Sequence, residues 1–352
     1  MNIRALSATL LSLGALTTAL RAQSGRQQFA DLGNFKLDNG QVIEHLRLGY
    51  RTLGHLNAAR TNAVLMPTWF SGISKQLLGD AGPQAGKLID TRRWYAVLVD
   101  SLGDGVTTSP SNSRLQPRLK FPHFSLRDMV RAEHALLTRK LHLRHVHAVL
   151  GISMGGFQTF QWVVSYPKFM SRAVPIVGSP RPTAYGLLLM RTSLEIIRSY
   201  AGWNHGNYRG RLVIPALMNL WTLHLTSPHH IATTVAPRNF QKFLWTSEHD
   251  QPYFDPDNWI RQGEAVLRFN TTRPYGGTLA GAAARVRAKM LIVPSAQDHM
   301  VYPGPAERFA KLVHARVFLL TSDCGHMATA CEARQLARQV RGFLAATDHV
   351  QR

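Results

Sequence analysis

The sequence predicts an α/β protein with a mostly parallel, doubly wound sheet and an inserted helical cap. Compact apolar runs without polar alternation indicate strands buried on both faces, as in parallel sheets covered by helices. These runs are "AVLMP" (63–67), "YAVLVD" (95–100), "RAVPIVG" (172–178), "KMLIVP" (289–294) and "RVFLL" (316–320). Between Gly178 and Gly281 this rhythm stops, and the segment is rich in Trp, Met, Leu, His and Tyr. We therefore expect a helical cap at about residues 179–284, over the carboxyl edge of the sheet, where ligands bind.

Length and composition allow one large domain of this class. The chain has 352 residues, of which 45% are hydrophobic and 17% are charged, enough to bury a sizeable core. The formal charge of +21 favours anionic partners and discourages self-association. Its basic residues are scattered and form no recognisable binding module, so we expect no nucleic-acid partner. The sequence leaves a monomer and a homodimer open.

The N-terminal segment has the pattern of a secretory signal peptide. Arg4 supplies a positive start, residues 5–20 are uncharged and mainly apolar, and small residues near Ala22 offer a cleavage point. The apolar run is short for a membrane span, and no later segment resembles one. We therefore expect residues 1–22 to be removed and residues 23–352 to be exported, to the periplasm or the medium. The alternative is an uncleaved N-terminal anchor.

Two cysteines, Cys324 and Cys331, would lie in an oxidising compartment if the chain is exported, and disulfides persist there. A bridge between them requires the intervening chain to turn back. The sequence leaves a disulfide and two buried thiols equally open.

The decapeptide "VLGISMGGFQ" (149–158) contains the pattern G-x-S-x-G, with its serine at Ser153. Before it, "HVHAVLG" reads as a short buried strand, and after it apolar residues recur at helical spacing until Pro167. A second helix is expected over "SLRDMVRAEHALLTRKL" (125–141), capped by Ser125. Alone, the pentapeptide is a weak signal that arises by chance in glycine-containing turns. At a strand–turn–helix junction, it predicts a nucleophile elbow.

A serine hydroxyl needs an adjacent base and a third group that orients the base. Nucleophile-elbow enzymes place these in the chain order serine, acid, histidine. Asp298 follows the apolar strand 289–294, and His326 follows the strand 316–320. We therefore predict Ser153, Asp298 and His326 as a catalytic triad. Asp323 is a weaker rival for the acid, and Asp100 precedes the serine and reads as a structural residue of a turn.

An oxyanion hole needs two backbone N–H groups aimed at the developing charge. We expect one from Met154, directly after the serine, and one from Phe70, in the segment "TWFSG" after the first apolar strand. Trp69 is the neighbouring alternative, and core packing of both aromatic residues is compatible with these roles.

Sixteen histidines make a lone histidine uninformative as a site residue. His142, His145 and His147 cluster where a helix gives way to a strand, but no cysteine or acidic residue accompanies them, so we expect no metal site there. His229 and His230 fall in the expected cap and are weaker candidates for the pocket wall. The predicted chemistry requires no metal or organic cofactor.

Beyond residue 22 the chain resembles the homoserine O-acetyltransferase family of α/β-hydrolase-fold proteins along nearly its whole length. The resemblance lies in "LRLGYRTLGHLNAARTNAVLMPTWFSG", "FSLRDMVRAEHALL", "GISMGGFQTFQWVVSYP", "VPSAQDHMVYP" and "CGHMA". It implies the α/β-hydrolase fold, the triad Ser153, Asp298 and His326, an acyl-enzyme and a cap over the site. The segment "SLGDGVTTSPSNS" (101–113) is more similar to the acyltransferase-like hydrolases of the same superfamily.

Three substrate-pocket positions depart from the homoserine-binding members. Met327 stands where they carry an aspartate for the substrate amine, and Leu217 stands where they carry an arginine for its carboxylate. Thr68, Trp69 and Phe70 replace a His-Ala-Leu sequence. Without charged partners, an amino acid's buried charges would be left unpaired, which is costly.

These observations predict an exported serine hydrolase that cleaves a small carboxylic ester or a related acyl compound. Export would also separate the protein from cytosolic acetyl-CoA and homoserine, which leaves water as the acceptor. The first alternative is an acyl-CoA-dependent O-acyltransferase of the homoserine acetyltransferase type. The second is a non-catalytic binding protein on the same fold.

Overall fold

The computed structural model describes residues 23–249 and 251–347. The predicted signal peptide, residues 1–22, lies outside this part of the chain and stays a prediction. An intact-mass measurement on protein from its native host would test it. Within the described residues, no helix combines the length and the apolar character needed to cross a bilayer.

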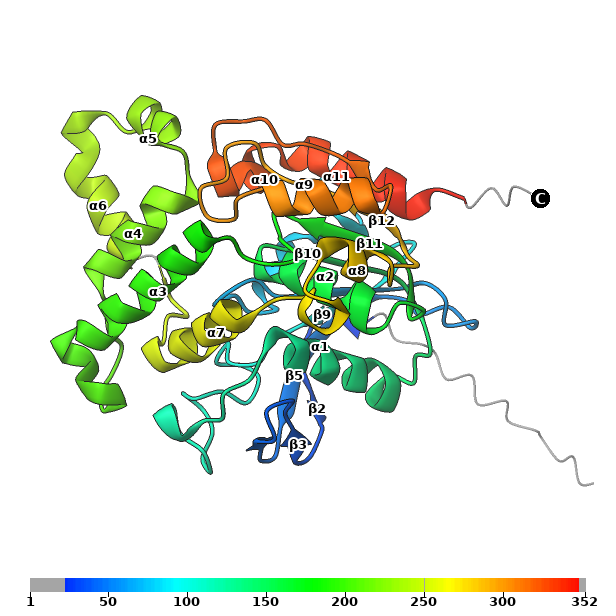
Figure 1. Cartoon of the computed structure of the whole chain (residues 1–352), viewed down its shortest axis with the longest axis horizontal. Coiled ribbons are helices and arrows are strands. Elements are labelled where there is room, and N and C mark those ends of the chain that lie inside the picture. The colour runs from blue at the N-terminus through cyan, green and yellow to red at the C-terminus, as the bar shows by residue number, and fades with distance from the viewer. Residues whose placement is uncertain (1–22, 250, 348–352) are drawn as a thin grey trace, which may run out of the picture.

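A large sheet forms the centre of the protein (Figure 1). Its strand order is β1-β5-β9-β6-β10-β11-β12-β13, and β2 pairs with β5. Neighbouring strands from β9 through β13 run parallel, whereas β5 pairs antiparallel with β1, β2 and β9. The bounds are β1 (Gln23–Ser24), β2 (Gln28–Asp31), β5 (Arg47–Gly54), β6 (Ala63–Pro67), β9 (Tyr95–Val99), β10 (Val146–Ile152), β11 (Met170–Ile176), β12 (Lys289–Ile292) and β13 (Arg316–Val317).

The strands predicted from apolar runs are all present in this sheet, which confirms the α/β class and its mostly parallel order. The antiparallel strands near the N-terminus were not predicted. Strand β5 buries Leu48, Tyr50 and Thr52 on one face and places Arg47 and Arg51 on the other, because it lies toward one edge of the sheet and need not be buried on both faces.

Both faces of the sheet are covered. Along β6, Val64 and Met66 belong to one hydrophobic cluster and Leu65 belongs to another, because successive side chains of a strand point to opposite faces. Helices α1 (Leu126–Ala135), α2 (Met154–Ser165) and α9 (Gly304–Leu312) contribute to the cluster of Leu65. Helix α11 (Ala333–Ala345) contributes to the cluster of Val64 and Met66.

The segment between β11 and β12 is helical, as expected, but it does not form one layer. It contains α3 (Ala184–Ser199), α4 (Pro215–Leu225), α5 (Pro228–Thr234), α6 (Phe240–His249), α7 (Pro256–Arg268) and α8 (Leu279–Ala283). Helices α3 to α6 lie to one side of the sheet (Figure 1), whereas α8 packs against α9 beside the sheet. The interval 179–284 therefore includes, at its end, a helix that packs with the sheet layer.

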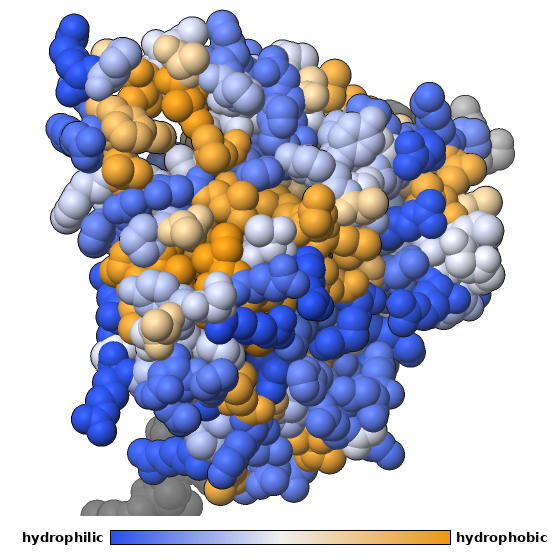
Figure 2. All heavy atoms as spheres, turned by 60° about the vertical axis from the view of Figure 1, so that its left-hand side comes forward, coloured by the Kyte–Doolittle hydropathy of each residue, from blue (hydrophilic) through white to orange (hydrophobic). Residues whose placement is uncertain are grey.

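The cap helices expose large apolar side chains. Leu188, Leu223, Phe240 and Trp245 are all half or more exposed. Figure 2 shows hydrophobic residues gathered on the face of the molecule that carries these helices. Mostly hydrophilic residues surround these hydrophobic ones in the same view.

The predicted helix over 125–141 is present in two parts. Ser125 accepts a hydrogen bond from the backbone N–H of Asp128, and the Asp128 carboxylate accepts one from the backbone N–H of Ser125, which completes a capping box. After α1 the chain forms one wider π-helical turn, η3 (Leu136–Lys140).

Short elements complete the described chain. They are the paired strands β3 (Phe35–Lys36) with β4 (Val42–Ile43) and β7 (Ala81–Gly82) with β8 (Ile89–Asp90), the helix α10 (Ala328–Cys331), and the 3-10 turns η1 (Gln76–Gly79), η2 (Arg118–Lys120), η4 (Ala201–Gly206), η5 (Pro237–Asn239), η6 (Arg273–Tyr275) and η7 (Gly325–Met327).

The buried carboxyl group of Glu133, on α1, should make the stability of the protein depend on pH. The Trp162 indole N–H donates to Oε2 of Glu133 at 2.6 Å, and Oε1 has no partner among the described residues. Burial raises the pKa of Glu133 from 4.5 to about 8, although the Trp162 hydrogen bond opposes the rise. The folded protein therefore holds a proton that the unfolded chain releases, so this stabilisation is complete below about pH 4.5 and is lost as the pH rises toward 8.

Glu133→Gln should flatten this pH dependence, because the amide oxygen can still accept from Trp162 and carries no charge. Relative to the variant, the wild-type protein should lose roughly 1–3 kcal/mol of unfolding free energy between pH 5 and pH 8. Urea unfolding at the two pH values measures the difference, with the exposed Glu195→Gln as control. Equal slopes in wild type and Glu133→Gln would contradict the prediction.

Candidate active site

Ser153 occupies a sharp turn between β10 and α2. Its φ is 56°, a conformation that residues with a side chain rarely adopt. Its backbone N–H donates to the carbonyl of Ile176 on β11 at 2.9 Å. A Cβ at Gly151 would lie 2.3 Å from the backbone of Gly155, so the turn requires glycine where these two residues meet. The predicted strand–turn–helix context is therefore present.

His326 lies between Ser153 and Asp298. Its Nε2 is 2.9 Å from Ser153 Oγ, and its Nδ1 is 2.7 Å from Asp298 Oδ2. The other carboxylate oxygen of Asp298 accepts the backbone N–H groups of Met300 and Val301 at 2.8 and 2.7 Å. The structure thus brings together the three side chains that the chain order predicted. These contacts orient the imidazole so that Nε2 can take a proton from the serine.

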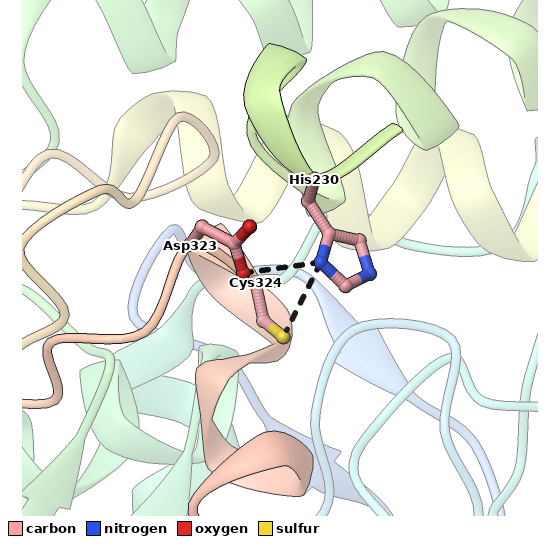
Figure 3. Close-up of side chains that lie close together, drawn as sticks. All are labelled: His230, Asp323 and Cys324. Carbon is pink, nitrogen blue, oxygen red and sulfur yellow. Dashed lines mark hydrogen bonds and ion pairs between the residues drawn. The ribbon is translucent and has the colours of Figure 1, made fainter. Parts of the chain in front are cut away.

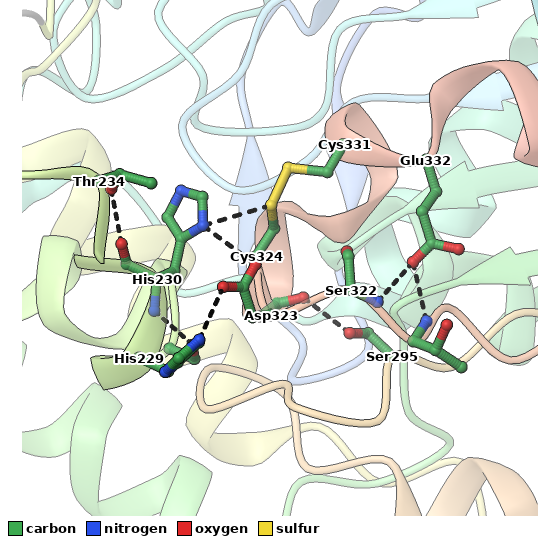
Figure 4. The surroundings of a disulfide bond; sticks show 12 residues. His229, His230, Thr234, Ser295, Ser322, Asp323, Cys324, Cys331 and Glu332 are labelled. Carbon is green, nitrogen blue, oxygen red and sulfur yellow. Dashed lines mark hydrogen bonds and ion pairs between the residues drawn. A yellow bond between two sulfur atoms is a disulfide. The ribbon is translucent and has the colours of Figure 1, made fainter. Parts of the chain in front are cut away.

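The rival acid, Asp323, pairs with two other histidines, whereas Nδ1 of His326 is engaged by Asp298. The Asp323 carboxylate contacts His230 at 3.2 Å and His229 at 3.8 Å, both on cap helix α5 (Figure 4). The two histidines therefore bind the loop that precedes His326, and they are not among the residues that line the cavity.

Cys324 and Cys331 form a disulfide, so the pairing left open by the sequence is resolved. Their Cα atoms are 6.5 Å apart, and η7 and α10 turn the chain back between them (Figure 4). His326 lies inside this closed loop. A hydrogen bond of 2.7 Å from the Ser295 hydroxyl to the carbonyl of Gly325 ties the loop to the end of β12.

His230, Asp323 and Cys324 lie within metal-binding distance of one another (Figure 3). The sulfur of Cys324 is bonded to Cys331 and offers no thiolate, which is the form that binds metals. With the disulfide formed, these three residues connect cap helix α5 to the loop that precedes His326. Two of the three histidines near the start of β10 also have protein partners: His145 contacts Ser171, and His147 contacts the carbonyl of Leu344.

The two backbone N–H groups predicted for the oxyanion hole, those of Met154 and Phe70, are available for a ligand. Met154 is the first residue of α2, where backbone N–H groups have no partner within the helix. Among the described residues, no hydrogen-bond acceptor engages the backbone N–H of Phe70. The Phe70 ring packs against Trp221 and Trp259, with centroids 5.2 and 4.9 Å away, and both Phe70 and Ser153 line one cavity.

Helix α7 holds the Phe70 loop in place, and sequence reasoning missed this support. Gln262 Oε1 accepts the backbone N–H of Ser71 at 2.7 Å, and the Trp259 indole N–H donates to the Ser71 hydroxyl at 2.7 Å. Gln262 also donates to the carbonyl of Leu102. These partners lie about 190 residues from Ser71 in the chain, and no local motif marks them.

The cavity has a volume of about 520 Å³ and contains Ser153 and His326 in its wall. Trp69 and Met327 also line it, as expected. Leu217 does not: it is fully buried in the core, and its neighbour Met218 reaches the cavity in its place. The expectation for Leu217 was therefore wrong by one residue, since the two side chains point to different sides of α4.

The cavity wall is mainly apolar and aromatic. Among the described residues it includes neither lysine nor arginine, and its one carboxylate is Asp80. A substrate carboxylate would therefore meet no cationic side chain there.

Comparisons with known proteins agree with this geometry. The sequence matches a family described as "alpha/beta hydrolase fold" over residues 77–330. It is 29% identical to an ethyl acetate hydrolase from Pseudomonas veronii, across 91% of this chain and 95% of that one. It is 27% identical to a homoserine O-acetyltransferase from Caulobacter vibrioides, across 96% and 98%. The solved structure of the acetyl esterase MekB superposes with a TM-score of 0.84 at 27% identity, covering 92% of this chain and 97% of that one.

Proposed function

The chain belongs to the α/β-hydrolase fold family, and on this premise we propose that it hydrolyses small carboxylic esters through an acyl-enzyme. It is an enzyme of this superfamily, an esterase or acyltransferase by its relatives. We further propose that water is the acyl acceptor, that Ser153, His326 and Asp298 act as nucleophile, base and orienting acid, and that the substrates are small esters.

In the first half-reaction, the Ser153 hydroxyl attacks the ester carbonyl while His326 Nε2, 2.9 Å away, takes its proton. The carbonyl oxygen becomes an oxyanion that accepts from the backbone N–H groups of Phe70 and Met154. His326 then gives its proton to the leaving alcohol, and an acyl group remains on Ser153. Asp298 holds the imidazole with Nδ1 protonated and stabilises its positive charge.

In the second half-reaction, water takes the place of the alcohol. His326 removes a proton from the water as it attacks the acyl carbonyl, and then returns that proton to Ser153 as the acid leaves. The proton transfers use Ser153, His326 and Asp298, which contact one another in the structure.

We propose water and not homoserine as the acyl acceptor because no lysine or arginine lines the cavity among the described residues. Homoserine has a carboxylate that would be buried without a partner, and burying an unpaired charge is strongly unfavourable. Met327, 41% exposed in the cavity wall, offers no charge to the amine. Water needs neither contact.

An acyltransferase that uses another alcohol is the second candidate, because it would share the first half-reaction and the overall similarity to homoserine O-acetyltransferases. A non-catalytic binding protein would have no need of the serine–histidine–aspartate contacts.

Asp298→Asn should lower kcat by about 10⁴-fold, since an amide that donates to Nδ1 selects the wrong imidazole tautomer. Asp323→Asn serves as the matched control, because its partners are the two histidines of α5. Steady-state hydrolysis of p-nitrophenyl acetate measures both. If Asp323→Asn were the more damaging change, the acid would have to be reassigned.

Hydrolysis and transfer differ in the acceptor, so one assay separates them. We expect saturable release of acid from short-chain p-nitrophenyl and alkyl esters. We expect no homoserine-dependent acceleration of thiol release from acetyl-CoA, because a charge-assisted hydrogen bond to the homoserine carboxylate, worth roughly 1.5–3 kcal/mol, would be missing. Saturable stimulation by homoserine with negligible ester hydrolysis would overturn the proposed function.

A further inference from the structure

The cavity extends to both faces of the sheet from the carboxyl end of β10. On one face its wall includes Phe157, Met190 and Val266, which belong to the hydrophobic cluster of α1 and α2. On the other face it includes Leu88 and Leu336, which belong to the cluster of α11. Ser153, which directly follows β10, lines the same cavity, so an ester held there can place its acyl part and its alcohol part against these two different groups of residues.

The part of the cavity beside Leu88 and Leu336 contains one carboxylate, Asp80, which directly follows η1. Its backbone is engaged: its N–H donates to Leu77, and its carbonyl accepts from Ile89. Its partly buried side chain has no hydrogen-bond or ion-pair partner among the described residues.

Asp90, ten residues further on, shows what a structural carboxylate in this region looks like. Arg92 donates to it at 3.0 and 2.9 Å, and Arg341 of α11 donates to it at 2.6 Å. Asp80 has no such arginine, and the nearby Lys87 donates to the carbonyl of Gly79. Burial raises the pKa of Asp80 to about 6, with Lys87 opposing the rise. At neutral pH the group is therefore a carboxylate that lacks a donor.

The position of His326 indicates which half of the ester meets Asp80. The leaving oxygen must come within hydrogen-bonding distance of His326 Nε2 to receive its proton. The residues that follow His326, among them Met327, Ala330 and Ala333, line the cavity and lead to Leu336. We therefore place the alcohol part of the ester on the side of the cavity where Asp80 lies.

We propose that Asp80 is a specificity-determining residue that accepts a hydrogen bond from a hydroxyl or ammonium group on the alcohol part of the ester. The inference rests on the proposed ester hydrolysis and adds the class of alcohol to it. Esters of diols and of amino alcohols fit this arrangement. Free amino acids do not, because their carboxylate would meet no cationic side chain among the described residues of the wall.

The test compares three series of acetate esters with alcohol parts of matched length: n-alkyl, ω-hydroxyalkyl and ω-aminoalkyl. For each, kcat/KM is measured with wild type, Asp80→Asn, Asp80→Leu and the exposed control Asp31→Asn. In wild type, the best hydroxyalkyl or aminoalkyl ester should exceed its n-alkyl counterpart about 10-fold or more, as expected for a hydrogen bond to a charged group.

The variants should separate charge from hydrogen bonding. Asp80→Asn should lower the preference for the ammonium ester more than the preference for the hydroxyl ester, because the amide oxygen still accepts a hydrogen bond but carries no negative charge. Asp80→Leu should abolish both, while hydrolysis of the n-alkyl esters persists in both variants. Asp31→Asn should match wild type throughout.

The two ways of failing are distinguishable. If wild type hydrolyses n-alkyl acetates without preferring a donor group, or if the preference survives Asp80→Leu, the role of Asp80 is refuted and ester hydrolysis stands. If wild type hydrolyses no ester of any series, the proposed function itself fails.

Discussion

At Ser153 the chain leaves β10 and enters α2 with a φ of 56°, which costs a residue with a side chain on the order of 1–2 kcal/mol. The neighbouring chain holds the residue in this conformation. Gly151 and Gly155 meet so closely that no Cβ fits between them, and β11 accepts the Ser153 N–H. The result is a hydroxyl fixed at the carboxyl edge of the sheet, toward which the other groups of the site converge.

Those groups come from segments with separate supports. Asp298 is fixed by two backbone N–H donors, and the loop of His326 is closed by a disulfide and tied to the end of β12. The loop of Phe70 is held by Gln262 from α7. Each of these groups is held by contacts that do not involve a substrate, which is the arrangement expected of a preorganised catalytic site. The cap contributes to this rigidity as well as to the cavity wall.

The sequence predicted the parts of this arrangement that depend on local pattern. Apolar runs marked the parallel strands, and the chain order of Ser153, Asp298 and His326 anticipated side chains that the fold brings within hydrogen-bonding distance. The sequence did not predict features that depend on contacts between distant residues or on the rotation of a helix about its axis. The contact of Gln262 with the Phe70 loop spans 191 residues. Leu217 was placed in the pocket by its match to an arginine of the homoserine-binding family members, and that match does not fix how α4 is rotated about its axis, so Met218 lines the cavity and Leu217 does not.

The central claim is that Ser153 is the nucleophile activated by His326. Treating the folded protein with a fluorophosphonate and locating the adduct by peptide mass spectrometry tests it directly. The account predicts one adduct, on the peptide that contains Ser153, and much slower labelling after His326→Ala with circular dichroism unchanged. An adduct on a different serine, or labelling at an undiminished rate in the folded His326→Ala variant, would contradict it.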